Sequence, residues 1–114
     1  MVVKILRPDE AAEFEAAGTF AGSPDDRRDG FIHLSRPEQV AGSLAKHFGG
    51  EDKLTLVPFD ATALGDGLRW EVSRGGALFP HFYGVLQRNL ALRMVVVSLD
   101  ETGTHVIPEG AFRC

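Results

Sequence analysis

Cysteine is nearly absent from this chain. The one cysteine, Cys114, is its last residue. A single thiol excludes an internal disulfide, a Cys-x-x-Cys redox pair and a thiolate metal cluster. A catalytic thiol needs a fixed partner, which a terminal residue rarely has. We therefore expect no chemistry at Cys114.

Long apolar runs and an excess of positive charge are also lacking. The longest strongly apolar run, LRMVVVSL at residues 92–99, is far too short to cross a bilayer. No basic and then apolar export signal opens the chain, so we expect a cytoplasmic protein without a membrane partner. The net charge of −4 argues against a nucleic-acid partner held by phosphate neutralisation.

Metal-ligand spacing is missing as well. None of the four histidines stands in a His-x-x-x-His pattern or beside a cysteine, so we expect no metal site. What is present is ordinary for a soluble globular protein, with 44% apolar and 25% charged residues. The length of 114 residues suffices for one hydrophobic core, which predicts a single domain over residues 1–114.

The order of the predicted elements indicates an α+β fold. A β-α-β-α start is followed mostly by strands, and we expect those later strands to be antiparallel. A polar, glycine-rich loop is expected at 18–30, a single helical turn after Asp60, and a closing hairpin around 100–103. Pro58 predicts a strand end or a sheet edge. Strands are predicted at 2–6, 31–34, 53–59, 68–72 and 90–99, and helices at 8–17 and 36–48.

The clearest local signal is the predicted helix at 36–48. Ser35 is a natural N-cap, and Glu38, three residues later, would complete a capping box. Gly49 would stop the helix. The apolar residues that recur every four positions, and should be buried, are Val40, Leu44 and Phe48.

The stretch DGFIHLS, residues 29–35, places a titratable histidine near the end of a short apolar strand. His33 is either a core histidine with a satisfied hydrogen bond or part of a site. Ser35 is either a helix cap alone or a ligand contact. Because sites often lie where strands end, we favour the site for His33.

A second polar place is RWE, residues 69–71, on a predicted strand. Strand alternation puts Leu68, Trp70 and Val72 on one face, and Arg69 and Glu71 on the other. An ordinary surface ion pair between Arg69 and Glu71 is one interpretation. The other makes Glu71 a carboxylate that holds a ribose hydroxyl or stabilises a cationic transition state.

A third is the loop SRGGALFPHFYG, residues 73–84. Adjacent glycines allow backbone amides to turn towards an anion, and Arg74 beside them could pair with a phosphate. Phe79, His81, Phe82 and Tyr83 offer flat faces on which a heteroaromatic ring can stack. The alternative is a glycine-rich loop that its aromatic residues pin to the core.

Together these motifs resemble a known family. DGFIHLS, AKHF at the end of the predicted helix, ALGDGLRWE and SRGGALFPHFYG are similar, in this order, to a bacterial family called domain of unknown function nine-five-two. The resemblance runs over essentially the whole chain. It implies a fold similar to that of ADP-ribosyltransferases, with a split core of two small, mostly antiparallel sheets and short helices around an NAD cleft. The family itself has no established activity, so any function is inferred only through the likeness of its fold to the transferases.

The resemblance also implies roles for particular residues. GFIHLS resembles the transferase strand that faces nicotinamide, which puts His33 or Ile32 where a stacking aromatic usually sits. The first strand offers Lys4 or Arg7, and no histidine, for the ribose on the adenosine side. Glu71 is the best-placed candidate for the catalytic glutamate.

These arguments lead to one main hypothesis and two alternatives. The first is a domain that binds NAD or a related nucleotide, not as a tightly bound cofactor but as a substrate, and that acts as a transferase or glycohydrolase at the ribosyl carbon. The second is a non-catalytic binding or regulatory module. The third is a toxin-like or RNA-end-processing enzyme, whose RNA form the acidic chain disfavours. The sequence indicates no oligomeric state. We expect His33, Arg69, Glu71, Arg74 and His81 to line one cleft, with Glu71 and His33 catalytic, and with Lys4, Ser35, Arg69, Trp70, Arg74, His81 and Tyr83 as ligand-binding residues.

Overall fold

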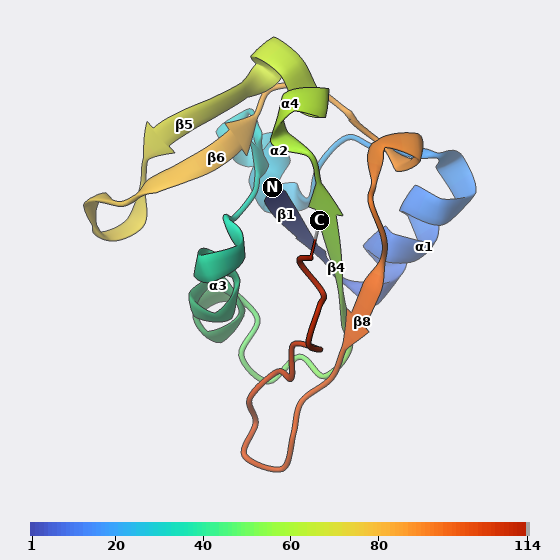
Figure 1. Cartoon of the computed structure of the whole chain (residues 1–114), viewed down its shortest axis with the longest axis vertical. Coiled ribbons are helices and arrows are strands. Elements are labelled where there is room, and N and C mark those ends of the chain that lie inside the picture. The colour runs from blue at the N-terminus through green and yellow to red at the C-terminus, as the bar shows by residue number, and fades with distance from the viewer. Residues whose placement is uncertain (114) are drawn as a thin grey trace.

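Antiparallel sheets and short helices form the fold (Figure 1). This computed structural model describes residues 1–113, apart from the side chain of Arg74. In that part of the chain one sheet has the strand order β1-β4-β8, a second has the order β3-β6-β5, and β2 pairs with β7. The strands are β1 (Val2–Leu6), β2 (Thr19–Phe20), β3 (Ile32–His33), β4 (Leu54–Phe59), β5 (Leu68–Val72), β6 (Leu78–Phe82), β7 (Leu86–Gln87) and β8 (Val95–Val97). The helices are α1 (Pro8–Ala17), α2 (Pro24–Asp29), α3 (Val40–His47) and α4 (Ala61–Leu64), with 3-10 turns at Pro37–Gln39, Gly65–Gly67, Arg74–Gly76 and Arg88–Leu90.

The predicted α+β class, with small antiparallel sheets and short helices, is confirmed. Helix α1 begins at Pro8, and its end follows from Gly18, which adopts a left-handed conformation (φ 78°) and donates its N–H to Phe14 O. The predicted turn after Asp60 is α4, where the Asp60 carboxylate accepts the Thr62 N–H at 3.0 Å. Within residues 1–113, no helix combines the length and apolar character that a membrane span requires.

Two segments that the sequence predicts as loops contain regular structure. Residues 18–30 hold α2, which Ser23 caps by accepting the Asp26 N–H, and which ends at the left-handed Gly30. Residues 73–84 hold β6, the central strand of the second sheet. The Pro80 carbonyl accepts the Leu34 N–H, so its missing N–H faces the β3 side just past His33, the last residue of β3, and the exchange costs the sheet one bond at the end of that ladder. The predicted strand at 90–99 is shorter, because continuous pairing with β4 covers only residues 95–97, and Ala91 adds a single bridge to Phe59.

Pro58 is similarly placed in the first sheet. It lies opposite Val3 near the end of the central strand β4, past the last residue that pairs with β8. Its carbonyl accepts the Leu92 N–H at 2.9 Å, so its missing N–H faces the same side, between the β8 ladder and the single bridge from Phe59 to Ala91. Pro58 therefore lies one residue before the end of β4, near the predicted strand end, but β4 is a central strand and not a sheet edge.

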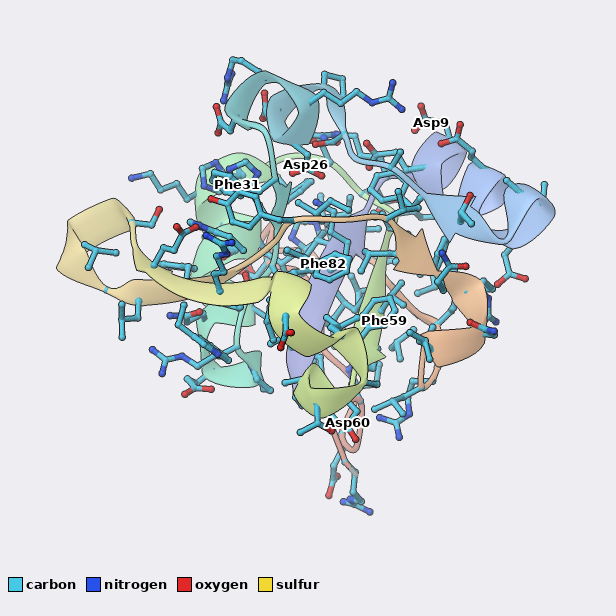
Figure 2. The ribbon with its side chains drawn as sticks, turned by 90° about the horizontal axis from the view of Figure 1, so that it is seen from above. Asp9, Asp26, Phe31, Phe59, Asp60 and Phe82 are labelled. Atoms are coloured by element: carbon cyan, nitrogen blue, oxygen red, sulfur yellow. The ribbon has the colours of Figure 1, made fainter. Side chains whose placement is uncertain are left out.

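Two apolar clusters fill the two faces of the first sheet. On one face Val2, Leu6 and Phe59 pack with Phe14 of α1, and on the other Val3 and Ile5 pack with α3 and β4. Successive residues of a strand point to opposite faces, so β1, which is buried throughout, supplies both clusters. Figure 2 shows Phe59 and Phe82 in the interior, and Figure 1 shows the β5 and β6 hairpin extending away from the first sheet.

The predicted cap of α3 is wrong. The helix is preceded by the turn Pro37–Gln39, and the side chain of Gln39, not that of Glu38, accepts the N–H of Arg36 at 2.9 Å. Ser35 is taken up elsewhere, because its backbone pairs with Val3 and its hydroxyl lies 3.0 Å from that of Ser43. The apolar face is mostly as predicted, with Val40 and Leu44 buried and Phe48 half-buried. The helix ends at His47, two residues before the predicted stop at Gly49.

Candidate functional site

A cavity of about 460 Å³ opens beside the edge of β1 that faces away from β4. Its walls come from β1, the start of α1, α2, the end of β3, α3 and β6. The volume lies in the usual range for sites that bind small molecules. Four of the predicted site residues line this cavity: Lys4, His33, Ser35 and His81.

The most connected side chain of this wall is Asp26 of α2, which the sequence did not single out. One carboxylate oxygen accepts the Lys4 ammonium and the Ser23 N–H, each at 2.9 Å. The other accepts two bonds from His33, from the backbone N–H at 3.0 Å and from ring Nδ1 at 2.6 Å. Asp26 is only 2% exposed and thus ties β1, α2 and β3 together.

The surroundings of Asp26 keep it ionised. Burial alone would raise its pKa, but the hydrogen bond from His33 and the nearby Lys4 charge outweigh that effect. The pKa of Asp26 is therefore held far below its usual range. A buried carboxylate with four donors is a fixed negative charge in the cavity wall.

His33 stands between two carboxylates. Its Nδ1 faces Asp26, and its Nε2 lies 2.9 Å from Oδ2 of Asp29, which Arg28 also contacts. Carboxylates only accept hydrogen bonds, so both contacts are satisfied when the ring carries a proton on each nitrogen. The His33 side chain is 39% exposed, so it is a partly open residue of the cavity wall and not an enclosed core histidine.

His81 is held by a different carboxylate. Its Nδ1 lies 2.8 Å from Oε1 of Glu71, and the Tyr83 hydroxyl donates to the same oxygen at 2.9 Å. These two hydrogen bonds, from His81 and Tyr83, keep the pKa of Glu71 below its usual value. The Phe31 ring stacks on the His81 ring, with centroids 4.0 Å apart, and fixes the plane of the imidazole.

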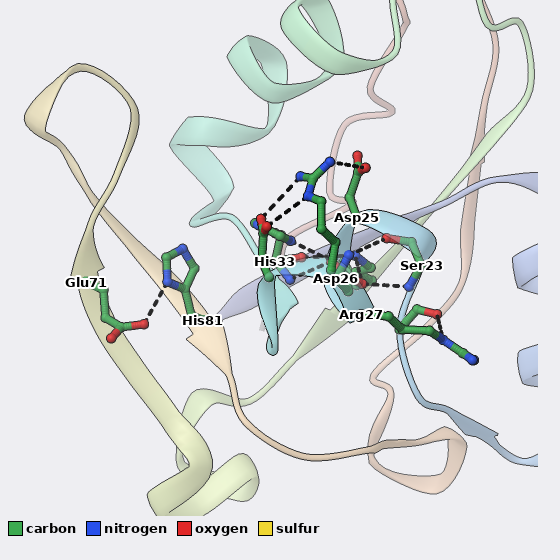
Figure 3. A network of polar contacts seen from close by, with 11 residues as sticks. Ser23, Asp25, Asp26, Arg27, His33, Glu71 and His81 are labelled. Carbon is green, nitrogen blue, oxygen red and sulfur yellow. Dashed lines mark hydrogen bonds and ion pairs between the residues drawn. The ribbon is translucent and has the colours of Figure 1, made fainter.

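The two histidines are direct neighbours across the second sheet. His33 of β3 lies opposite His81 of β6, and the ring centroids are 5.7 Å apart in an edge-on arrangement. Figure 3 shows the two carboxylate–histidine pairs side by side, His33 with Asp26 and His81 with Glu71. The sheet register therefore places two imidazoles, each anchored by a carboxylate, at one cavity.

The other predicted residues lie around this centre or away from it. Glu71 is on the far side of His81 from the cavity and is not among the lining residues. Arg69 lies over the Tyr83 ring at 5.0 Å and does not line the cavity either. Trp70 points to the opposite face, where it is 44% exposed and faces Arg36. The predicted role of the Arg74 side chain lies outside the described residues, as does that of Cys114.

The expected single cleft is thus only partly formed by the expected residues. Of the five side chains expected in it, the cavity brings together His33 and His81, whereas Arg69 and Glu71 lie behind them on the same sheet face. Arg7, the alternative to Lys4, also lines the cavity and forms an ion pair with Glu51 at 2.8 Å. The lining residues that sequence reasoning missed include Ser23, Asp25, Asp26, Arg28, Asp29, Ser43 and Lys46.

A signal for Asp26 was present in the sequence. Ser23 and Asp26 stand three residues apart in SPDD, the spacing of a reciprocal helix cap, and both hydrogen bonds of that cap form. The cap predicts α2, but not the burial of the carboxylate, which depends on Lys4 from a distant strand. Among the described residues, no group of three or more His, Cys, Asp or Glu side chains is arranged to hold a metal ion.

Comparison with known proteins gives a family and a close structural match. The model of a protein family of unknown function, DUF952, matches residues 5–97. The crystal structure of protein CC0527 from Caulobacter crescentus is 43% identical, with a TM-score of 0.87 over 92% of each chain. Its solution NMR structure is 44% identical, with a TM-score of 0.81 over 90% of this chain and 89% of that one. A comparison with curated proteins finds no match.

Proposed function

Because the chain belongs to the DUF952 family, whose function is unknown, we propose a function from its own site: the cavity binds a small nucleotide-type ligand, with NAD as the first candidate. The observation that carries this proposal is the cavity beside β1 with its paired histidines. The likeness of GFIHLS and its following helix to the ADP-ribosyltransferases supports NAD before other nucleotides.

The wall offers the groups that such a ligand needs. Arg28 and Lys46 are cations at the cavity that can pair with phosphate oxygens. The Ser35 and Ser43 hydroxyls can bond to ribose, and Phe79 adds an apolar aromatic wall. Charged, hydroxyl and aromatic groups thus converge on one space.

Cleavage of NAD at the ribosyl carbon is the catalytic form of this proposal. It would need a carboxylate near the ribose, and Glu71 is separated from the cavity by His81. That position favours the second candidate, a binding or regulatory module that holds the nucleotide without cleaving it. Incubation with NAD followed by a measurement of free nicotinamide separates the two.

Binding itself is tested by calorimetry with NAD, ADP-ribose and nicotinamide. Lys46 lines the cavity, whereas the exposed Lys53 does not, so Lys46→Gln and Lys53→Gln form a matched pair. We expect Lys46→Gln to weaken binding of NAD and ADP-ribose about two- to fivefold, the value of one exposed charge pair, and Lys53→Gln to change nothing. No heat with any of the three compounds on folded protein would refute the proposal.

A further inference from the structure

The two histidines of the cavity differ in how their ring nitrogens are held. His81 gives Nδ1 to Glu71, and since a carboxylate only accepts, the neutral ring keeps a lone pair on Nε2. Among the side chains that the structure describes, which do not include that of Arg74, no hydrogen-bond partner of that Nε2 is found. His33 instead has both nitrogens at carboxylates, and both contacts are hydrogen bonds only when each nitrogen carries a proton. One ring is thus arranged to accept a proton and the other to donate one.

From this asymmetry we propose that the cavity is a hydrolytic site for cyclic phosphodiesters of ribonucleotides, with His81 as general base and His33 as general acid. The proposal rests on nucleotide binding in the same cavity. It adds a reaction and a substrate class, and it makes Glu71 and Asp26 positioning residues that hold the two rings.

A general acid at His33 favours a reaction in which the leaving group departs through an oxygen atom. Nicotinamide leaves NAD as a neutral base and needs no proton, so a general acid would contribute nothing to that cleavage. An alkoxide leaving from phosphorus is a poor leaving group until it is protonated, and there an acid contributes fully. Arg28 lines the cavity near His33 and can balance the phosphate charge. A cyclic phosphate also needs only one nucleotide in the cavity.

The proposed step is a simple hydrolysis. His81 Nε2 takes a proton from water, and the water oxygen forms a bond to phosphorus. The bond from phosphorus to one ribose oxygen breaks, and that oxygen takes the proton from His33 Nε2. The products are a nucleoside monophosphate, a neutral His33 and a protonated His81, and exchange of protons with solvent restores both rings.

Asp29 occupies the place that the leaving oxygen would take. Its Oδ2 lies 2.9 Å from His33 Nε2. The other contact of the Asp29 carboxylate is an ion pair with Arg28, which is largely exposed. Such a pair contributes little to stability, so a substrate oxygen can replace Asp29 at His33. Arg28, whose exposed pairs with Asp25 and Asp29 are weak, can then contact the phosphate. The contact between Nδ1 of His33 and Asp26 is buried on the aspartate side and would persist.

The test compares two substrates that differ in their need for an acid. Hydrolysis of 2′,3′-cyclic AMP expels an alkoxide, whereas bis(4-nitrophenyl) phosphate expels 4-nitrophenolate, which leaves without a proton at neutral pH. His81→Gln should reduce kcat/KM about 10²- to 10⁴-fold for both substrates. His33→Gln should cause about the same loss for the cyclic nucleotide only. Lys53→Gln, outside the cavity, is the control.

The outcomes are distinct from those for binding alone. Calorimetric binding of 2′,3′-cyclic AMP without any release of AMP would overturn the hydrolytic site and leave nucleotide binding intact, whereas absence of nucleotide binding removes both. Equal losses for both substrates in His33→Gln would refute the acid. If that variant does not fold, the acid is tested on the wild-type protein, by measuring kcat/KM for a series of aryl phosphodiesters whose leaving groups differ in pKa. A shallow dependence on the leaving group supports the acid, and a steep one refutes it.

Discussion

Replacing Asp26 by asparagine should strongly destabilise the protein. The carboxylate accepts four hydrogen bonds, two at each oxygen. Asparagine keeps one acceptor oxygen and presents an amide donor to the other two donors, so two of the four bonds are lost. If Lys4 is among them, its ammonium, with a side chain only 7% exposed, is left as a buried charge without its partner. Breaking a buried ion pair from one side typically costs about 3–5 kcal/mol.

That cost is large against the total stability of a small domain, which is about 5–15 kcal/mol. We expect the Tm of Asp26→Asn to fall by more than about 10 °C, measured by circular dichroism. The neighbouring Asp25→Asn is the control, because the Asp25 side chain is 69% exposed and its ion pair with Arg28, at 3.1 Å, lies at the surface. It should cost less than about 1 kcal/mol. Similar losses in both variants would show that the network around Asp26 contributes no more than a surface pair.

A double-mutant cycle separates the Lys4 contribution from the rest. In Lys4→Met the buried ammonium is gone, so a further Asp26→Asn exchange no longer leaves it unpaired. The second exchange should then cost at least about 1 kcal/mol less than it does in the parent, as expected for residues in direct contact. Additive losses in urea denaturation would mean that the Lys4–Asp26 contact is not energetically coupled.

Three further predictions concern stability. The lowered pKa of Asp26 stabilises the folded protein above the unfolded pKa of about 3.9, and this stability is lost as the pH falls towards the folded value. The difference in unfolding free energy between the parent and Asp26→Asn, measured by urea denaturation, should therefore narrow below about pH 4. Gly67→Ala should destabilise the protein by about 1–3 kcal/mol, because the new Cβ would lie 2.9 Å from a backbone oxygen. Gly42→Ala, which adds a Cβ in open space on α3, should stabilise it by about 0.5–1 kcal/mol. Equal shifts of Tm in the two variants would contradict both predictions. Ser35→Ala should cost about 1 kcal/mol in thermal melts through the lost hydroxyl contact with Ser43, and that cost should disappear in a Ser43→Ala background.

The parts of the fold that local patterns specify were predictable. β1 and β4 are runs of apolar residues that are buried on both faces, and the apolar spacing of α3 shows which side packs on the sheet. β6 was not predictable from its own sequence, because it becomes a strand by pairing with β3 and β5, two segments far from each other in the chain. α2 has no apolar stripe at all, and its one buried residue is Asp26. In the sequence, only the capping residues Ser23 and Gly30 indicate this helix.

The candidate site was predictable in part for the same reason. His33 stands out as a polar residue in a predicted apolar strand, and His81 as a histidine among the glycines and aromatic residues of the predicted loop at 73–84, and both line the cavity. Asp26 did not stand out, since a carboxylate in SPDDRRD is expected to be solvated. Its burial depends on Lys4, and nothing local to either residue indicates that the two meet. The position of Glu71 behind His81 likewise follows from how β5 pairs with β6.

The direct contact between the two histidines is a consequence of core packing. Ile32 lies opposite Phe82 in the register of β3 and β6, and both are buried in the same apolar cluster. Because side chains alternate along a strand, fixing that apolar pair on one face places His33 opposite His81 on the other. A shift of one residue would expose Ile32 and turn His33 into the core, which makes the alternative register costly. The same burial that stabilises the second sheet therefore sets the spacing of the two imidazoles at the cavity.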